Sequence, residues 1–226
     1  MPVPPALMAL RDVSYRLNDQ PLLQDLSFSL EPGELVMLRG PSGSGKSTLL
    51  KLMAQMLTPD SGHILFQGQE STAIDPVAYR RQVSYGFQSP QLFGETVYDN
   101  LAFPYLIRHE PVDEAKIRDG LAQAGLPEAL LMKPVTSLSG GEKQRVALLR
   151  NLQYMPKVLL LDEVTSALDG ENKQRIGGLI RRVCRQHQTA VLWVSHDPQE
   201  DLHAGRVLWL ENGRVTALAP HAEAQP

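Results

Sequence analysis

The sequence contains a single cysteine, Cys184, among 226 residues. One cysteine excludes an internal disulfide framework and is typical of a reducing compartment. No apolar run approaches the ~20 residues that a helix needs to span a bilayer, and the N-terminal stretch lacks the basic region and apolar core of a signal peptide. We therefore expect a cytoplasmic protein, whose role at a membrane depends on a partner.

The sequence also has no excess of positive charge. The formal net charge is −3, so the chain has no basic surplus with which to release counterions from DNA or RNA. We expect no nucleic-acid partner, and we interpret the pairs Arg80-Arg81 and Arg181-Arg182 as solvated helix faces. With 42% apolar and 21% charged residues, the composition is typical of a globular protein of one or two domains.

One stretch, Gly40-Pro41-Ser42-Gly43-Ser44-Gly45-Lys46-Ser47-Thr48, follows an apolar run and precedes a helical pattern. This order of strand, glycine loop and helix is the context in which GxxxxGK[ST] binds phosphate. Gly43 and Gly45 let backbone N–H groups point inward together. Lys46 is expected to reach the β- and γ-phosphates of ATP, and the Ser47 hydroxyl to ligate Mg²⁺. The alternative is a glycine-rich turn that only joins a strand to a helix.

The periodicity of the remaining residues predicts an α/β fold in which an antiparallel sheet lies beside this P-loop NTPase unit. Asp75 and Asp169 are predicted to cap helices. We expect the helix after the loop to begin at Thr48 and to end near Pro59, because proline cannot continue it. Strands are predicted at residues 10–17, 22–30, 35–38, 64–66, 83–86, 158–161, 190–194, 207–210 and 215–218.

Between residues 96 and about 153 the pattern becomes helical almost throughout. We interpret this region as an α-helical subdomain inserted between strands of the core. The whole chain, 1–226, is then one domain. Its core comprises about 1–88 and 155–226, and the helical subdomain about 89–154.

Polar side chains follow three predicted core strands: Gln88, the pair Asp162 and Glu163, and His196. Ligands bind at the carboxyl ends of strands in doubly wound sheets, so these groups should converge on the phosphates. Asp162 fits the carboxylate that positions Mg²⁺, and Glu163 could polarise a water molecule for attack on the γ-phosphate. A turn or helix cap is the alternative for the carboxylates, and a structural role is the alternative for His196.

The segment Leu138-Ser139-Gly140-Gly141-Glu142 begins another predicted helix. Ser139 is suited to cap it, and the two glycines expose backbone N–H groups at its N-terminus, which would form a second anion site. One nucleotide needs only one phosphate cradle. The second site therefore serves the nucleotide of another copy of the chain, or it is only a cap.

Together these motifs resemble the nucleotide-binding subunits of ABC transporters over nearly the whole chain. The resemblance rests on Tyr15, residues 40–48, Gln88, residues 138–144, residues 158–163, residues 166–169 and His196. It implies the ABC ATPase fold, with a RecA-like core, an antiparallel β subdomain and an inserted helical subdomain. It also implies an ATP-dependent homodimer beneath an integral membrane permease, at the cytoplasmic face of the inner membrane.

The resemblance also implies a role for each site residue. Tyr15 stacks on adenine, Gln88 couples Mg²⁺ and the attacking water to the helical subdomain, and His196 contacts the γ-phosphate. Ser139, Gly140 and Gly141 bind the γ-phosphate held by the partner copy, with Leu138 and Glu142 completing that signature. The segment after Gln88, including Leu92, Phe93 and Tyr98, is expected to face the permease or to pack in the helical subdomain.

Within the family, residues 82–101 and 150–157 resemble the ATPase subunits of a bacterial two-component iron-export system. That resemblance implies iron as the cargo. Other cargoes, namely amino acids, lipoproteins or other metals, are the alternatives. A soluble ABC-type ATPase acting on DNA or ribosomes, a small-molecule kinase and an ATP-binding scaffold are the rival functions.

Overall fold

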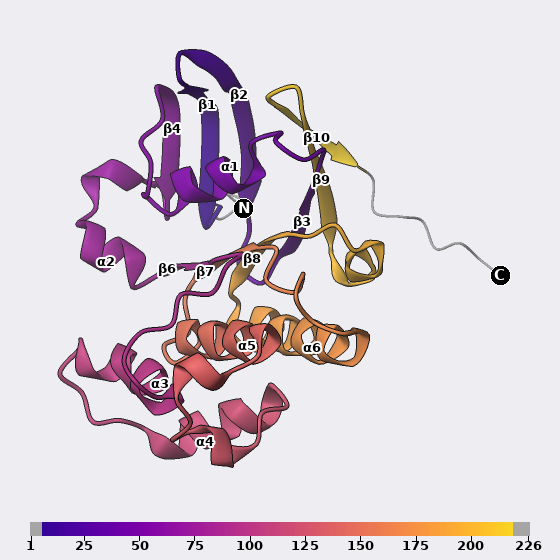
Figure 1. Cartoon of the computed structure of the whole chain (residues 1–226). Coiled ribbons are helices and arrows are strands. Elements are labelled where there is room, and N and C mark those ends of the chain that lie inside the picture. The colour runs from indigo at the N-terminus through magenta and orange to yellow at the C-terminus, as the bar shows by residue number, and fades with distance from the viewer. Residues whose placement is uncertain (1–5, 219–226) are drawn as a thin grey trace.

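A mostly parallel sheet at the centre of the fold carries the phosphate loop. The computed structural model describes residues 6–218, and Figure 1 shows this sheet between a layer of helices and an antiparallel sheet. Its strand order is β10-β9-β3-β8-β7-β6, and only the edge pair β10–β9 is antiparallel among the described residues. The strands are β3 Leu35–Arg39, β6 Val83–Gly86, β7 Val158–Asp162, β8 Ala190–Val194, β9 Arg206–Glu211 and β10 Arg214–Leu218.

The second sheet is antiparallel, with the order β2-β1-β4-β5. Its strands are β1 Met8–Leu17, β2 Gln20–Leu30, β4 Ser61–Phe66 and β5 Gln69–Glu70. The predicted antiparallel sheet beside the nucleotide-binding unit is confirmed. Leu10, Leu26 and Phe66 are buried on one face of this sheet, as the alternation of apolar residues predicts.

Helices cover both faces of the central sheet. The α-helices are α1 Lys46–Met53, α2 Pro76–Arg80, α3 Val97–Leu106, α4 Glu114–Gln123, α5 Gly140–Asn151 and α6 Gly170–His187. Short 3₁₀ turns are η1 Ser71–Ala73, η2 Glu128–Leu130, η3 Val135–Ser137 and η4 Pro198–His203.

The two faces of the sheet belong to two separate apolar cores. Successive strand residues point to opposite faces, so Met37 and Trp193 pack in one cluster with side chains of α5 and α6. Leu38 and Leu192 pack in the other cluster, with α1 and the antiparallel sheet. Helices α1 and α5 therefore lie on opposite faces of the sheet (Figure 1).

The predicted helix caps are confirmed, but the limits of α1 were wrong. Asp75 accepts a hydrogen bond from the N–H of Ala78, and Asp169 caps α6. α1 begins at Lys46 and ends at Met53, well before Pro59. The reason is local, because Gln55 adopts a left-handed conformation (φ 54°) and the chain leaves the helix there.

Helices α3, α4 and α5 fall between β6 and β7, where the helical insertion was predicted. They are separated by longer irregular stretches than the pattern suggested, and the exact division into subdomains stays a prediction. Cys184 is buried, and its Sγ lies 3.1 Å from the carbonyl oxygen of Gly33. Among residues 6–218, no helix combines the length and the apolar character that crossing a membrane requires.

Candidate functional site

The phosphate loop joins β3 to α1 through conformations that glycine adopts most readily. Gly40, Gly43 and Gly45 have φ values of +145°, +77° and +100°. A Cβ atom at Gly40 would lie 2.0 Å from the carbonyl oxygen of Leu210, so β9 packs directly against the start of the loop. Apart from the neighbouring residues in the chain, no atom of residues 6–218 lies within 4 Å of the Cβ position at Gly43, so the tip of the loop is open.

Lys46 spans the loop from the first turn of α1. Its Nζ donates to the carbonyl oxygens of Gly40 (2.9 Å) and Pro41 (2.8 Å). Burial lowers the pKa of Lys46, while the nearby carboxylates of Glu163 and Asp162 act in the opposite direction. The loop lysine and the carboxylates after β7 therefore share one electrostatic environment, as the strand-end argument predicts.

Two hydroxyl groups, from α1 and β6, hydrogen-bond to the Asp162 carboxylate at the end of β7. The Ser47 hydroxyl donates to Asp162 Oδ1 at 3.0 Å, and the Tyr85 hydroxyl donates to Asp162 Oδ2 at 2.7 Å. Burial, followed by the contact with Asp162, raises the pKa of Tyr85 well above its ordinary value, so this hydroxyl stays protonated and holds the carboxylate in place. In the loop, the Ser44 Oγ atom is buried without a hydrogen-bond partner among the described residues.

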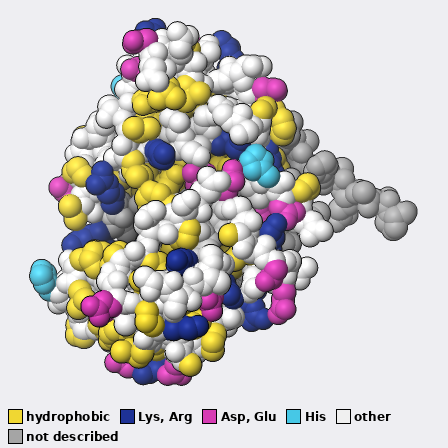
Figure 2. All heavy atoms as spheres, in the orientation of Figure 1, with side chains coloured by type: hydrophobic (Ala, Val, Ile, Leu, Met, Phe, Trp, Pro, Cys, Tyr) yellow, Lys and Arg dark blue, Asp and Glu magenta, His cyan; other side chains and the backbone are white. Residues whose placement is uncertain are grey.

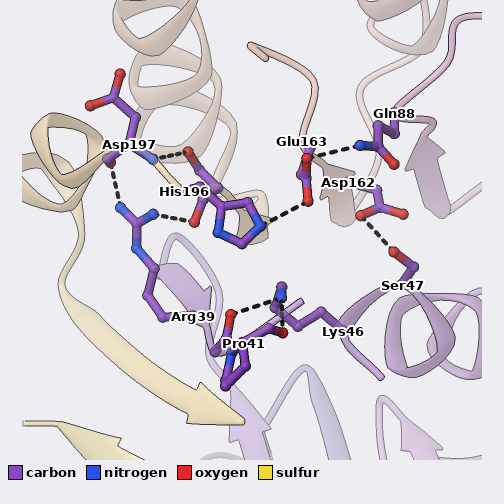
Figure 3. A network of polar contacts seen from close by, with 11 residues as sticks. Arg39, Pro41, Lys46, Ser47, Gln88, Asp162, Glu163, His196 and Asp197 are labelled. Atoms are coloured by element: carbon purple, nitrogen blue, oxygen red, sulfur yellow. Dashed lines mark hydrogen bonds and ion pairs between the residues drawn. The ribbon is translucent and has the colours of Figure 1, made fainter. Parts of the chain in front are cut away.

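Glu163 is held by two side chains from neighbouring strand ends (Figure 3). Gln88 Nε2 donates to Oε2 at 2.9 Å, and His196 Nε2 lies 3.1 Å from Oε1. Glu163 itself adopts a left-handed conformation (φ 49°), which turns its side chain away from the line of β7. A pocket of about 420 Å³ opens beside Glu163 and His196.

The residues of the second anion site do not join this cluster. Ser139 is the N-cap of α5, and it forms a reciprocal capping box with Glu142 (3.2 and 2.8 Å). Outside the helix's own backbone and the neighbouring residues, no atom of the described part of the chain lies within 4 Å of the Cβ position at Gly140, so this helix N-terminus is open. It belongs to the opposite face of the sheet from α1, and both interpretations of Ser139 remain compatible with its geometry in one copy.

Tyr15 lies close to the phosphate loop by way of the antiparallel sheet. It pairs with Leu23 across β1 and β2, and the Leu23 side chain comes within 2.8 Å of the Cβ position at Gly45. The ring is half-buried against the core that contains α1. Tyr15 is therefore partly accessible, and its cross-strand neighbour Leu23 is the residue that reaches the loop.

Sequence reasoning missed two residues of the site, Tyr85 and Arg39. Tyr85 lies on β6, and only the order of the strands in the sheet reveals that it reaches Asp162 on β7. Arg39 ends the P-loop strand, one residue beyond the predicted range 35–38, and its guanidinium donates to the carbonyl oxygens of Ser195 and Asp197. A charged residue at the end of a fully buried strand was the available signal.

This fold and this loop define a P-loop nucleoside triphosphatase. Residues 23–166 match the family described as ABC transporter. The chain is 50% identical to the "Probable iron export ATP-binding protein FetA" of Escherichia coli (strain K12), over 91% of each chain. It is 38% identical to the "Sulfate/thiosulfate import ATP-binding protein CysA" of Bordetella parapertussis, over 95% of this chain but only 62% of that one.

The solved dimeric structure of a post-hydrolysis state of the ATP-binding cassette MJ0796, bound to ADP and Pi, is similar to this chain with a TM-score of 0.84. The identity is 26%, over 94% of this chain and 99% of that one. The chain belongs to the ABC transporter family. It is the ATP-binding and ATP-hydrolysing subunit of such a transporter, and the predicted fold class is confirmed.

Proposed function

We propose that this subunit drives the export of iron through a separate, FetB-like membrane permease, from the cytoplasmic face of the inner membrane. The support is the sequence identity to FetA, which is 50% over 91% of both chains. The sulfate importers are less similar, and the chain spans only about 62% of their length. A second cargo class therefore has less support.

In the proposed reaction, the backbone N–H groups of residues 40–48 and Lys46 hold the phosphates, and Tyr15 stacks on adenine. Glu163 accepts a proton from the water that attacks the γ-phosphorus, while the bond from that phosphorus to the β–γ bridging oxygen breaks and ADP leaves. Its carboxylate is suited to this role because Gln88 and His196 hold it at the end of β7 beside an open pocket. Gln88 orients that carboxylate and the water. His196, on the other side of Glu163, donates to the γ-phosphate.

The donor set suits Mg²⁺. The Ser47 hydroxyl and the Asp162 carboxylate are adjacent oxygen groups, 3.0 Å apart, that would hold the ion, and the amide oxygen of Gln88 is a third candidate. The Ser44 hydroxyl, which is buried without a hydrogen-bond partner among the described residues, could donate a hydrogen bond to a phosphate oxygen. A bound Mg²⁺ would neutralise charge on the β- and γ-phosphates. Existing contacts hold these groups in place: Asp162 bonds to Ser47 and Tyr85, and Gln88 bonds to Glu163.

The catalytic pocket is proposed to be complete only in a homodimer. Residues 138–142 present an open helix N-terminus on the other face of the sheet from α1, which is where the phosphates of a second copy could be bound. Two copies in head-to-tail arrangement would then share two nucleotides. The dimer reported for MJ0796 supports this arrangement.

A groove between α2 and α3 is the proposed docking site of the permease. Its volume is about 380 Å³, and four arginines line it without any acidic residue: Arg80, Arg81, Arg108 and Arg150. Val77, Ile107 and Phe103 add apolar surface and are 60%, 48% and 39% exposed. Figure 2 shows basic and hydrophobic side chains around a hollow on the left of this face. In a chain of net charge −3, this surface fits a permease segment that carries carboxylates beside apolar side chains.

The groove is connected to the metal-binding carboxylate through hydrogen bonds. Asn151, in the groove wall, donates to the carbonyl oxygen of Tyr85 (3.0 Å), and the Tyr85 hydroxyl holds Asp162. Phe93 packs edge-to-face on Phe103 of the groove, whereas Leu92 and Tyr98 pack on the helical core. A permease segment in the groove therefore has a short physical route to the nucleotide.

Reversing the charge at the groove is expected to uncouple the two subunits. In the double variant Arg80→Glu/Arg81→Glu, copurification with the permease and stimulation of hydrolysis by it should fall at least about tenfold, because both side chains are exposed in the groove. Hydrolysis by the isolated subunit should change less than about twofold. The matched control is Arg181→Glu/Arg182→Glu on α6, which should retain the permease. Equal permease binding in all three proteins would contradict the docking site.

The cargo is tested by transport. Proteoliposomes that contain the subunit and its copurified permease should move Fe²⁺ in the presence of ATP, and a strain without the gene should accumulate iron and become sensitive to it. Lys46→Ala provides the inactive control. Transport of sulfate but not of iron would replace the proposed cargo without changing the assignment as an ABC ATPase.

A further inference from the structure

Arg39 is a buried cation that the proposed reaction does not use. It is the last residue of β3, its exposed fraction is 7%, and Gly40 follows it directly. A buried guanidinium needs hydrogen-bond acceptors to offset the loss of water. Its NH1 and NH2 groups donate to the carbonyl oxygens of Ser195 and Asp197. These are the two residues on either side of His196. Figure 3 shows this pair of hydrogen bonds, which we call the Arg39 fork, beside the His196 segment.

The fork fixes the backbone from which the imidazole projects. The His196 side chain is 54% exposed, and its Nε2 lies 3.1 Å from Glu163 Oε1, so the ring has this polar contact but little packing around it. The segment is ordered instead through its backbone. Besides the two bonds from Arg39, the Asp197 N–H donates to Ser195 Oγ (3.0 Å), and Lys173 binds the Asp197 carboxylate (2.8 Å).

The other end of Arg39 is anchored in the phosphate loop. Its carbonyl carbon is bonded to the nitrogen of Gly40, whose own carbonyl accepts from Lys46 (2.9 Å). Leu210 packs against Gly40 so closely that no side chain fits there. A shift of the phosphate loop would therefore carry the Arg39 fork with it.

We propose that Arg39 is a positioning residue, which sets the imidazole of His196 relative to the phosphate loop and to Glu163. The planar guanidinium suits this task, because it donates two parallel hydrogen bonds in a fixed geometry that lysine cannot reproduce. The inference depends on the proposed contact of His196 with the γ-phosphate. It adds Arg39 to that site, as the residue that keeps the position of His196 fixed relative to the phosphate loop.

The kinetic test compares Arg39→Met, Arg39→Lys and His196→Gln. Arg39→Met should lower kcat about 10- to 100-fold, because a misplacement of about 1 Å at a reacting group can cost up to about 100-fold. KM for ATP should change less than about threefold, because the phosphate cradle is intact. Arg39→Lys should recover part of the loss. In the His196→Gln background, Arg39→Met should have no further effect on kcat, because its effect is transmitted through that histidine.

A spectroscopic readout separates positioning from general stability. His196 is identified in histidine ¹H–¹³C spectra as the resonance missing in His196→Gln, and it should shift towards that of a free imidazole in Arg39→Met. Arg145→Met is the matched control, because Arg145 is also buried and also donates to backbone carbonyls, those of Ala124 and Gly125. It should leave the His196 resonance in place.

An unchanged His196 resonance in folded Arg39→Met, or multiplicative losses of kcat in the double variant, would overturn the inference. The proposed function fails separately. If His196→Gln turns over at the wild-type rate, His196 has no role at the γ-phosphate, yet the resonance shift still shows whether Arg39 holds the ring.

Discussion

Replacing Glu163 with glutamine is expected to lower kcat at least about 100-fold, since a general base contributes roughly 10²- to 10⁴-fold. Glutamine has the same shape but cannot take the proton of the attacking water. Its amide oxygen can still accept the bond from Gln88 Nε2 that the carboxylate accepts at 2.9 Å. The protein should fold normally, bind ATP with unchanged affinity, and accumulate as an ATP-bound dimer, measured by light scattering after gel filtration.

Glu171→Gln is the matched control for this variant. Its carboxylate is exposed on α6 and forms an ion pair with Arg175 at 3.1 Å, so turnover should stay within about twofold of wild type. Wild-type turnover in Glu163→Gln itself would remove Glu163 from the role of base. Another acceptor would then have to be sought at the end of β7.

The second large effect is expected from Ser139→Arg. The N-terminus of α5 has room for the new side chain in one copy, because Ser139 is exposed to solvent. Loss of the cap costs about 1 kcal/mol, which leaves the fold intact. In a dimer, however, the arginine would occupy the space of the partner's γ-phosphate. Hydrolysis should fall at least about 100-fold, while binding of ATP to the monomer, followed by fluorescent nucleotide titration, should be unchanged.

Ser139→Ala separates the two contributions. It removes the same cap and hydroxyl without adding bulk, and it leaves the backbone N–H groups of Gly140 and Gly141 accessible, so it should retain clearly more turnover than Ser139→Arg. If Ser139→Arg hydrolyses ATP at the rate of wild type, Ser139 is only a helix cap. The alternative that the sequence left open would then be the correct one.

The parts of the site that lie within one segment could be predicted from the sequence. The residues 40–48 carry their own context of strand and helix, and Asp75 and Asp169 are followed by helical patterns that need a cap. The carboxyl ends of the parallel strands also had to meet, because β6, β7 and β8 are neighbours in the sheet. The contacts of Glu163 with both Gln88 and His196 follow from that arrangement.

Features that depend on side-chain direction or on a single dihedral angle could not be predicted. The end of α1 is set by the left-handed Gln55, whereas Pro59 is the visible helix breaker. The fork of Arg39 joins residues more than 150 positions apart, and no periodicity encodes that distance. The arginine groove likewise combines α2, α3 and the end of α5. The pair Arg80-Arg81 alone could not predict that Arg108 and Arg150 lie beside it.

The shared catalytic pocket is tested most directly by the initial rate of ATP hydrolysis as a function of enzyme concentration, at saturating ATP. If each pocket needs groups from two copies, mass action gives a slope of about two in a double-logarithmic plot at high dilution, falling to about one as the dimer saturates. A slope of one at every concentration, with no ATP-dependent dimer at any of them, would show that a single copy is sufficient and would contradict the account.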